Sequence, residues 1–380
     1  MTKYEQLQAA KRNNQLIDLV LRRTQDLYTG EVCFVADRWV LLRTYNDYGM
    51  LDGYVLVKNS GIAYLSATSV DVKRLHGRIA LAKRLQLLKG QLYPLPNLNE
   101  ASLLDQIVQD CIQKQSAVLL VANTGDIFQQ AYLQKLTADR LQFAVIDPFN
   151  FARVGQLQTI NLSKVVALEF GGRQLMQATA FFKNLPEHKA PVLLKKNKFL
   201  PKMLEQAKSQ LLIIYCGENS NNFFVGQVKN VTATEVLVSL VDSVGCFGGY
   251  VLLKIKAIAY VGAIADYLQM MQIYEDEHKQ NGDFVQPVLN NHFIADPKNM
   301  WASVFAQLAQ TKATFRLQIK GQMQTQLAYC LNLTATKVKL AVFTDLPANI
   351  TQEIVCDFAE IDLVTWGYLN TYFTKCELIG

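Results

Sequence analysis

The sequence predicts a mainly β fold with added helices, built from four tandem copies of one small five-stranded barrel module. Three observations predict this fold class. A stretch of 38 residues recurs in the second half of the chain, a shorter stretch recurs at nearly the same spacing, and each half also repeats within itself. Such internal duplication is typical of repeat architectures. Half of the residues are hydrophobic, so the chain can form packed cores.

The longest repeat is the first observation. Residues 28–65 align with residues 224–261 without a gap, and 14 of these positions are identical. Residues 53–56 (Gly-Tyr-Val-Leu) return unchanged as residues 249–252. Glycines kept in register indicate a shared backbone shape, because glycine adopts conformations that other residues resist. The glycine pairs are Gly30 and Gly226, Gly49 and Gly245, and Gly53 and Gly249.

The shorter repeats divide each half again. Tyr132 and residues 136–138 match Tyr329 and residues 333–335 at a shift of 197. Within both halves a weaker similarity appears at a shift of 102, so we expect four copies of one module. The predicted domains are residues 1–100, residues 101–185, residues 186–298 (a linker followed by the third module) and residues 299–380.

One module has a predictable order of elements. In the first copy, apolar residues at helical spacing predict a helix over residues 4–15. Short apolar and β-rich runs separated by turn residues then predict five strands. Gly30 and Gly53 are the expected bend positions, so the strands should curl into a small barrel. The expected strands are 16–21, 30–35, 39–45, 54–58 and 62–65, with a loop at 48–53; residues 66–115 and 262–312 are expected to be largely helical.

Two stretches of the first copy resemble a known family. Residues 28–32 (Tyr-Thr-Gly-Glu-Val) and 37–42 (Asp-Arg-Trp-Val-Leu-Leu) resemble the first motif of Sm-like proteins. Residues 54–58 and 62–65 resemble the second motif. The resemblance is clear in the first and third copies only, and other SH3-like barrels have similar short apolar motifs. It implies that each module is an SH3-like barrel of five strands.

The same resemblance implies a function. Sm-like proteins assemble into rings and bind RNA at loops between subunits. By this resemblance the chain is a non-enzymatic protein that binds RNA or other single-stranded nucleic acid and has a regulatory role. The alternative is an interaction scaffold that self-assembles, or binds another protein, through its barrel modules.

Charge is spread unevenly and suggests where nucleic acid would bind. Residues 1–200 hold 25 Lys and Arg against 16 Asp and Glu, whereas residues 201–380 hold 13 against 16. Nucleic-acid binding needs such cations together with aromatic platforms. Trp39, Tyr54 and Tyr64 either supply these platforms or pack inside the barrels. The candidate cations are Lys73, Arg74, Arg78, Lys83 and Arg84 on one helix, and Lys189, Lys195, Lys196, Lys198 and Lys202 around the linker.

Residues that carry catalysis or bind metals show no recognisable pattern. The sequence has no HExxH, GxSxG, Walker A or GxGxxG motif, and its seven cysteines form no CxxC pair. We therefore expect no catalytic site, cofactor or metal. Five loop carboxylates are expected to form turns, with cation binding as the alternative. They are Asp47, Asp52, Asp147, Asp242 and Asp345.

Location is predicted from what the sequence lacks. No apolar run approaches the roughly 18–20 residues that a membrane-spanning helix needs. Residues 1–5 are polar, without the apolar stretch of a signal peptide. We therefore expect a cytoplasmic protein with no membrane partner.

Overall fold

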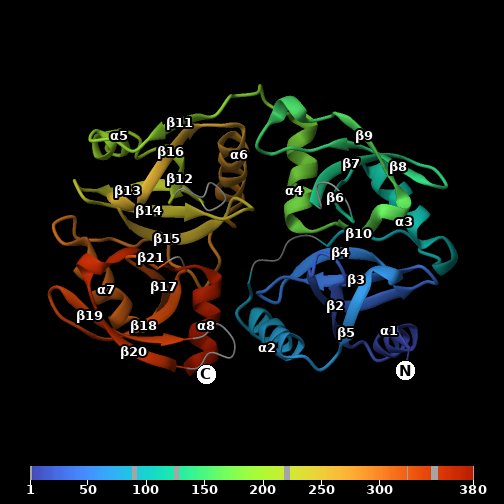
Figure 1. Ribbon diagram of the computed structural model, residues 1–380, viewed down its shortest axis with the longest axis horizontal. Helices are drawn as coiled ribbons and strands as arrows, with labels where there is room; N and C mark the ends of the chain where they lie inside the picture. Colours follow the sequence, from blue (N-terminus) through green and yellow to red (C-terminus); the bar gives the residue numbers. More distant parts are fainter. Residues whose placement is uncertain are drawn as a thin grey trace. The chain divides into compact units, whose positions relative to one another are not determined.

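The chain forms two compact units, Met1–His188 and Lys189–Gly380. The computed structural model describes residues 2–87, 92–123, 128–217, 223–322, 324–343 and 350–379. The division lies close to the expected boundary between residues 185 and 186. We call the two parts unit 1 and unit 2 and describe each by itself (Figure 1). None of the described helices is both long and apolar enough to cross a membrane.

Unit 1 contains two sets of five strands, each introduced by a helix. The first set, module 1, consists of α1 (Lys3–Arg12), β1 (Leu16–Leu21), β2 (Leu27–Val35), β3 (Trp39–Tyr45), β4 (Leu51–Lys58), β5 (Ile62–Ser66) and α2 (Val70–Arg84). The second set, module 2, consists of α3 (Leu103–Lys114), β6 (Ala117–Ala122), β7 (Phe128–Leu136), β8 (Arg140–Val145), β9 (Leu157–Asn161), β10 (Val165–Phe170) and α4 (Arg173–Phe181).

Unit 2 repeats this order. Module 3 consists of β11 (Val192–Lys195), α5 (Leu200–Gln206), β12 (Leu211–Cys216), β13 (Phe223–Val231), β14 (Glu235–Val241), β15 (Phe247–Lys254), β16 (Ile258–Ile264) and α6 (Asp266–Asn281). Module 4 consists of α7 (Met300–Gln310), β17 (Thr314–Ile319), β18 (Gln326–Leu333), β19 (Lys337–Phe343), β20 (Ile350–Asp357), β21 (Ile361–Trp366) and α8 (Leu369–Ile379).

The structure differs from the sequence prediction in several segments. Within the connections expected to be largely helical, residues 92–99 and 283–299 contain no helix. The expected loop at 48–53 is shorter, because β4 already begins at Leu51 and includes Gly53. The expected linker after residue 186 contains β11, which the sequence prediction missed. β11 pairs with β16, with Leu194 opposite Val261, so the backbone of this apolar run finds hydrogen-bond partners in the sheet.

Strand pairing joins the modules of each unit into one antiparallel sheet. In unit 1 the order is β5-β1-β2-β3-β4-β10-β6-β7-β8-β9, and in unit 2 it is β11-β16-β12-β13-β14-β15-β21-β17-β18-β19-β20. When the five strands of a module are numbered along the chain, their spatial order in the sheet is thus fifth, first, second, third and fourth in every module. Both orders are linear, so neither sheet closes into a barrel in the described part of the chain. The mainly β class with helices is confirmed, whereas four separate closed barrels are not seen.

Neighbouring residues of one strand enter different cores. Leu41 of β3 and Leu56 of β4 belong to a cluster covered by α3, whereas Val40 and Val57 belong to one covered by α1. This follows from the two-residue period of a strand, whose successive side chains point to opposite faces. The strands therefore read as continuous apolar runs, since both faces are buried.

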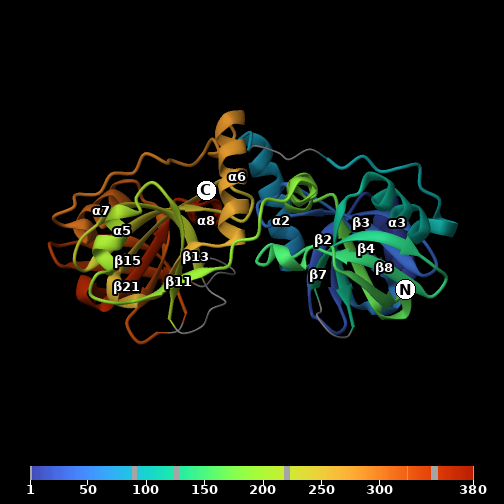
Figure 2. The same ribbon diagram turned by 90° about the horizontal axis from the view of Figure 1, so that it is seen from above.

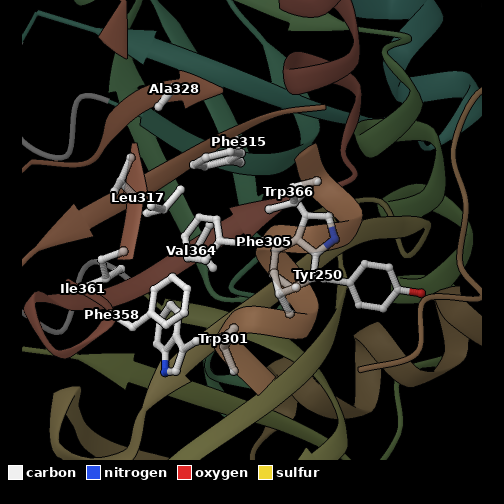
Figure 3. Packing of buried hydrophobic residues seen from close by; sticks show 14 of the residues in the cluster. Tyr250, Trp301, Phe305, Phe315, Leu317, Ala328, Phe358, Ile361, Val364 and Trp366 are labelled. Carbon is white, nitrogen blue, oxygen red and sulfur yellow. The ribbon is translucent and has the colours of Figure 1, made fainter. Parts of the chain in front are cut away.

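Unit 2 is packed in the same way. Helix α7 covers one face, and its Phe305 stacks on Phe358 with ring centroids 5.4 Å apart. Figure 3 shows this cluster, in which Tyr250 of β15 lies beside Trp366 of β21. Helix α5 packs near the other face, along β13 (Figure 2). The duplication seen in the sequence is therefore also a duplication of cores.

Two of the repeated glycines mark close backbone contacts between modules. Gly53 has φ +88°, and a Cβ atom there would lie 2.3 Å from the backbone nitrogen of Gly172. Gly249 has φ +90°, and its Cβ would lie 2.4 Å from the carbonyl oxygen of Trp366. Both sites exclude a side chain sterically and require a backbone torsion that L residues resist. This requirement explains why glycine recurs at the two positions.

We predict that Gly53→Ala lowers the free energy of unfolding by about 2–4 kcal/mol, through the positive φ and the backbone clash. Gly77→Ala is the control, because Gly77 lies in α2 with no atom within 4 Å of its Cβ position. Alanine there should stabilise the helix by about 0.5–1 kcal/mol. Chemical denaturation of both variants measures the difference, and equal stabilities would contradict this account.

Candidate nucleic-acid interface

The basic residues predicted on α2 do not share one environment. Lys73, Lys83 and Arg84 are exposed, and Arg74 is half-buried. Arg78 is 4% exposed, and its guanidinium donates a hydrogen bond of 2.6 Å to the carbonyl oxygen of Asp47. Its position follows from helical spacing, which places it on the same face as the buried Leu75 and Ala82. The buried Arg78 side chain thus holds the β3–β4 connection in place through this hydrogen bond.

Three members of the second predicted basic set lie at the end of β11, whereas Lys189 precedes this strand and Lys202 belongs to α5. Lys195, Lys196 and Lys198 are all exposed. The Lys196 ammonium donates a hydrogen bond of 2.8 Å to the carbonyl oxygen of Lys256. The Lys198 ammonium lies 5.1 Å from the centre of the Phe199 ring. This set belongs to unit 2, whereas the α2 set belongs to unit 1.

The predicted aromatic platforms separate into core and surface. Trp39 and Tyr54 are 7% and 5% exposed and pack in the core covered by α3. The prediction that Trp39 and Tyr54 stack on nucleic-acid bases is therefore wrong, and the alternative prediction that they pack in the interior is confirmed. Tyr64 on β5 is 57% exposed, so it alone of the three can offer a ring face to a base.

A cationic cavity that the sequence prediction missed lies where modules 1 and 2 meet. Its volume is about 170 Å³. Arg22 and Arg23 come from the turn after β1, and Lys58 comes from the end of β4. Asn123 and Ser163 of module 2 complete the wall. No Asp or Glu is found among the described residues that line this cavity.

Backbone carbonyls hold the three cations in place. Arg22 donates to the carbonyl oxygen of Ile62 at 3.2 Å, and Lys58 donates to that of Ser163 at 3.2 Å. Arg23 makes a longer contact of 3.5 Å with the carbonyl oxygen of Asn123. A guanidinium has five donors and an ammonium three, so each side chain has more donors than these contacts use. The arrangement suits an anion, above all a phosphate group.

Sequence reasoning missed this cavity because its residues are distant in the chain. Arg22 and Lys58 approach each other through the pairing of β1 with β5, and Ser163 joins them through the pairing of β4 with β10. The short helical turns at 59–61 and 162–164 lie at this junction, and a Cβ on Gly61 would lie 3.5 Å from the Val166 side chain. The available signal was the adjacent pair Arg22-Arg23.

Two of the five loop carboxylates form turns, as the sequence predicts. Asp147 accepts hydrogen bonds from the backbone amides of Phe149 and Asn150. Asp242 accepts two from Val244 and Cys246. Asp345 lies outside the described residues. Asp47 and Asp52 instead line a second cavity in unit 1, of about 400 Å³.

The environments of the cysteines and of His278 give no indication of a catalytic or metal-binding role. All seven cysteines are free thiols. Burial raises the pKa of Cys111 to about 12, which keeps this thiol protonated and unreactive. His278 is 6% exposed, and its Nδ1 lies 2.7 Å from a carboxylate oxygen of Asp283. Within the described residues, no group of three or more His, Cys, Asp or Glu side chains is placed to hold a metal ion.

Comparison with known proteins finds no relative. A scan against protein-family models gives no match for the chain. A search of curated proteins also gives no significant match. A function for the chain is therefore inferred from its own sequence and structure.

We predict that Arg78→Ala lowers the free energy of unfolding by about 1–3 kcal/mol, because the Asp47 carbonyl loses its donor and the packed stem is removed. Lys83→Ala on the same helix removes one exposed charge and should change stability by less than about 0.5 kcal/mol. Denaturant titration of the two variants provides the measurement. Similar effects would show that Arg78 has no special structural role.

Proposed function

We propose that the chain is a non-enzymatic, Sm-like RNA-binding protein, and that the cavity around Arg22, Arg23 and Lys58 takes a backbone phosphate. The single observation that carries the proposal is this cavity, in which three cations line a small space and no carboxylate occurs among the lining residues that the structure describes. Phosphate contacts of this kind supply most of the affinity of sequence-independent nucleic-acid binding.

Three further observations support the proposal. The resemblance of residues 28–42 and 54–65 to the Sm-like motifs implies an RNA-binding family. The order fifth, first, second, third, fourth strand in each module is compatible with a strongly bent, SH3-like arrangement. The exposed Tyr64 lies on β5, the strand that follows the 59–61 turn of the cavity, so a base next to the bound phosphate has an aromatic platform nearby.

The strands also place the cavity at a junction between modules. β4 of module 1 pairs with β10 of module 2, with Leu56 opposite Leu168. The cavity takes its cations from module 1 and its polar wall from module 2. A ligand there contacts both modules, which is the arrangement that the Sm-like resemblance implies for RNA between neighbouring subunits.

We predict that the combined Arg22→Ala, Arg23→Ala and Lys58→Ala variant binds single-stranded RNA at least about tenfold more weakly at low salt. The slope of log affinity against log salt should also fall by about 0.7, since the cavity holds one phosphate and each lost phosphate contact removes roughly that amount. Fluorescence anisotropy with labelled RNA over a salt series measures both quantities. Duplex DNA serves as the comparison ligand.

The matched control removes the same number of charges elsewhere in unit 1. Lys73→Ala, Lys83→Ala and Arg84→Ala act on exposed residues of α2 and should leave the salt slope nearly unchanged. If the α2 variant loses binding instead, the RNA interface lies on α2 and the cavity proposal is wrong. If the wild-type protein binds no RNA at low salt, the nucleic-acid function itself is refuted.

A second function, self-assembly, is favoured by the sheet edges. In unit 2 the outer edge of β16 is covered by β11, whereas β5, the corresponding strand of unit 1, ends its sheet (Figure 1). Exposed apolar residues lie on both end strands of unit 1: Tyr64 is 57% exposed and Leu157 on β9 is 64% exposed. Open edges of this kind are templates for pairing with another chain. The proposed occupant is β9 of a second copy on β5.

We predict that wild-type protein forms dimers or larger species at micromolar concentration, and that Tyr64→Lys with Leu157→Lys returns it to the monomer mass. A lysine on an edge strand disfavours strand addition. Val70→Lys is the control, because Val70 is 63% exposed but lies on α2. Light scattering after gel filtration gives the mass, and a monomeric wild-type protein would refute self-assembly.

A further inference from the structure

The second cavity of unit 1 has aromatic walls. It has a volume of about 400 Å³ and lies where β4 meets β10. Its rings are those of Tyr28, Tyr45, Tyr48, Tyr54 and Phe170. Tyr54 and Phe170 stack on each other with centroids 5.6 Å apart and form the floor. They are only 5% and 1% exposed, so the half-buried Tyr28, Tyr45 and Tyr48 supply most of the exposed ring surface. The cavity lies within the size range of small-molecule sites, about 300–1,000 Å³.

The same cavity carries carboxylates. Asp47, Asp52 and Glu169 line it, and none of its described lining residues is Lys or Arg. Glu169 accepts a hydrogen bond of 2.5 Å from the Tyr28 hydroxyl, so its position is fixed. Burial, and then the charges of Asp52 and Asp26, raise the pKa of Glu169, although the Tyr28 hydrogen bond opposes this. Asp52 as a whole is exposed, but desolvation of its carboxyl by the surrounding protein atoms, and then the charge of Asp47, raise its pKa to about 6.

Unit 2 shows that the fold does not require these carboxylates. Tyr250 and Trp366 repeat the floor, again with centroids 5.6 Å apart (Figure 3). Strand register identifies the counterpart of Glu169: it lies opposite Val55, and Thr365 lies opposite the equivalent Val251.

The remaining positions of the unit 2 cavity have also lost their charge. Asp52 aligns with Gly248 and Asp47 with Ser243. A cavity of unit 2 is lined by Gly248, Thr365 and the cationic Arg316, although the stacked Tyr250 and Trp366 are not among its lining residues. The positions that carry carboxylates in unit 1 are therefore uncharged in unit 2, which argues that the fold itself does not need these carboxylates.

We infer that the aromatic cavity of unit 1 binds a small organic cation, namely an alkylated ammonium group. Carboxylates supply the opposite charge, and electron-rich ring faces attract a cation that carries apolar methyl groups. A metal ion fits less well, since the described residues offer no cluster of three or more ligating side chains. The mostly aromatic wall suits a ligand that is apolar outside its charge.

The residues have separate roles in this site. Tyr54 and Phe170 form the stacked floor, and Tyr45 and Tyr48 line the wall near the β3–β4 turn. The orientation of the Tyr45 ring is fixed by its hydroxyl, which donates a hydrogen bond of 2.8 Å to Glu31. Asp52 and Glu169 supply the charge. Gly172 allows the backbones to approach here, because a Cβ atom at this position would lie 2.8 Å from the carbonyl oxygen of Asp52.

Binding should depend on pH in a defined direction. A bound cation favours the ionised form of Asp52, so affinity should rise from about pH 5 to about pH 7 as this carboxyl loses its proton. Other charged groups lie around Asp52 and are part of the same titration. They are Asp47 on the preceding turn, Glu169 on β10 with Tyr28 on β2, Arg78 of α2 below the Asp47 carbonyl, and Arg173 at the start of α4.

The test compares choline with dimethylbutanol, its neutral carbon isostere, on the full chain by calorimetry. We expect choline to bind at least about tenfold more tightly than the isostere, a difference of about 1.4 kcal/mol. Asp52→Asn should weaken choline binding about tenfold and remove most of the rise with pH. Glu169→Gln should weaken it as well, and serves as a second variant should the first disturb folding.

The control is Asp139→Asn, which removes one negative charge from an exposed side chain of module 2 and should leave choline binding unchanged. Equal binding of choline and its isostere would overturn the proposal, because charge would then play no part. So would the absence of choline binding at millimolar concentration, or displacement of choline by magnesium at constant ionic strength.

Discussion

The backbone pairing of a fourth strand with the fifth strand of the next module is the contact on which the rest of the structure depends. In unit 1 it joins β4 to β10, and in unit 2 it joins β15 to β21. Each junction extends one antiparallel sheet across two modules and supplies hydrogen bonds to strand edges that would otherwise face solvent. This pairing requires glycine at positions 53 and 249, because a side chain at either position would overlap with the backbone of the next module.

Both candidate sites of unit 1 follow from this junction. One end of the pairing brings Lys58 beside Ser163 and forms the cationic cavity. The other end brings Tyr54 beside Phe170 and Glu169, and forms the aromatic cavity. The two cavities have opposite charge although they share the strands β4 and β10. A pair of modules therefore places cationic and acidic side chains at the two ends of a single strand pair.

The sequence predicted the elements well, and their assembly less well. Repeats and apolar periodicity placed the duplication and most strands, because these depend on residues close in the chain. Pairing between β4 and β10 was not predicted, since it joins residues more than 100 positions apart that share no local signal. The same limit applies to the cavities. Arg78 is a different case: its spacing from Leu75 and Ala82 was a local signal for burial, but its charge favoured the surface, where Lys83 of the same helix lies.

The β4–β10 contact has a consequence for synthesis on the ribosome. β4 ends at Lys58, and β10 begins only at Val165. At roughly 5–20 residues per second, on the order of 10 s pass between the emergence of the two strands. During that time the apolar β4 edge of a nascent module 1 has no partner, and edges of this kind attract other chains. Nascent chains on neighbouring ribosomes are therefore most exposed to wrong strand pairing within this interval, before the second module is complete.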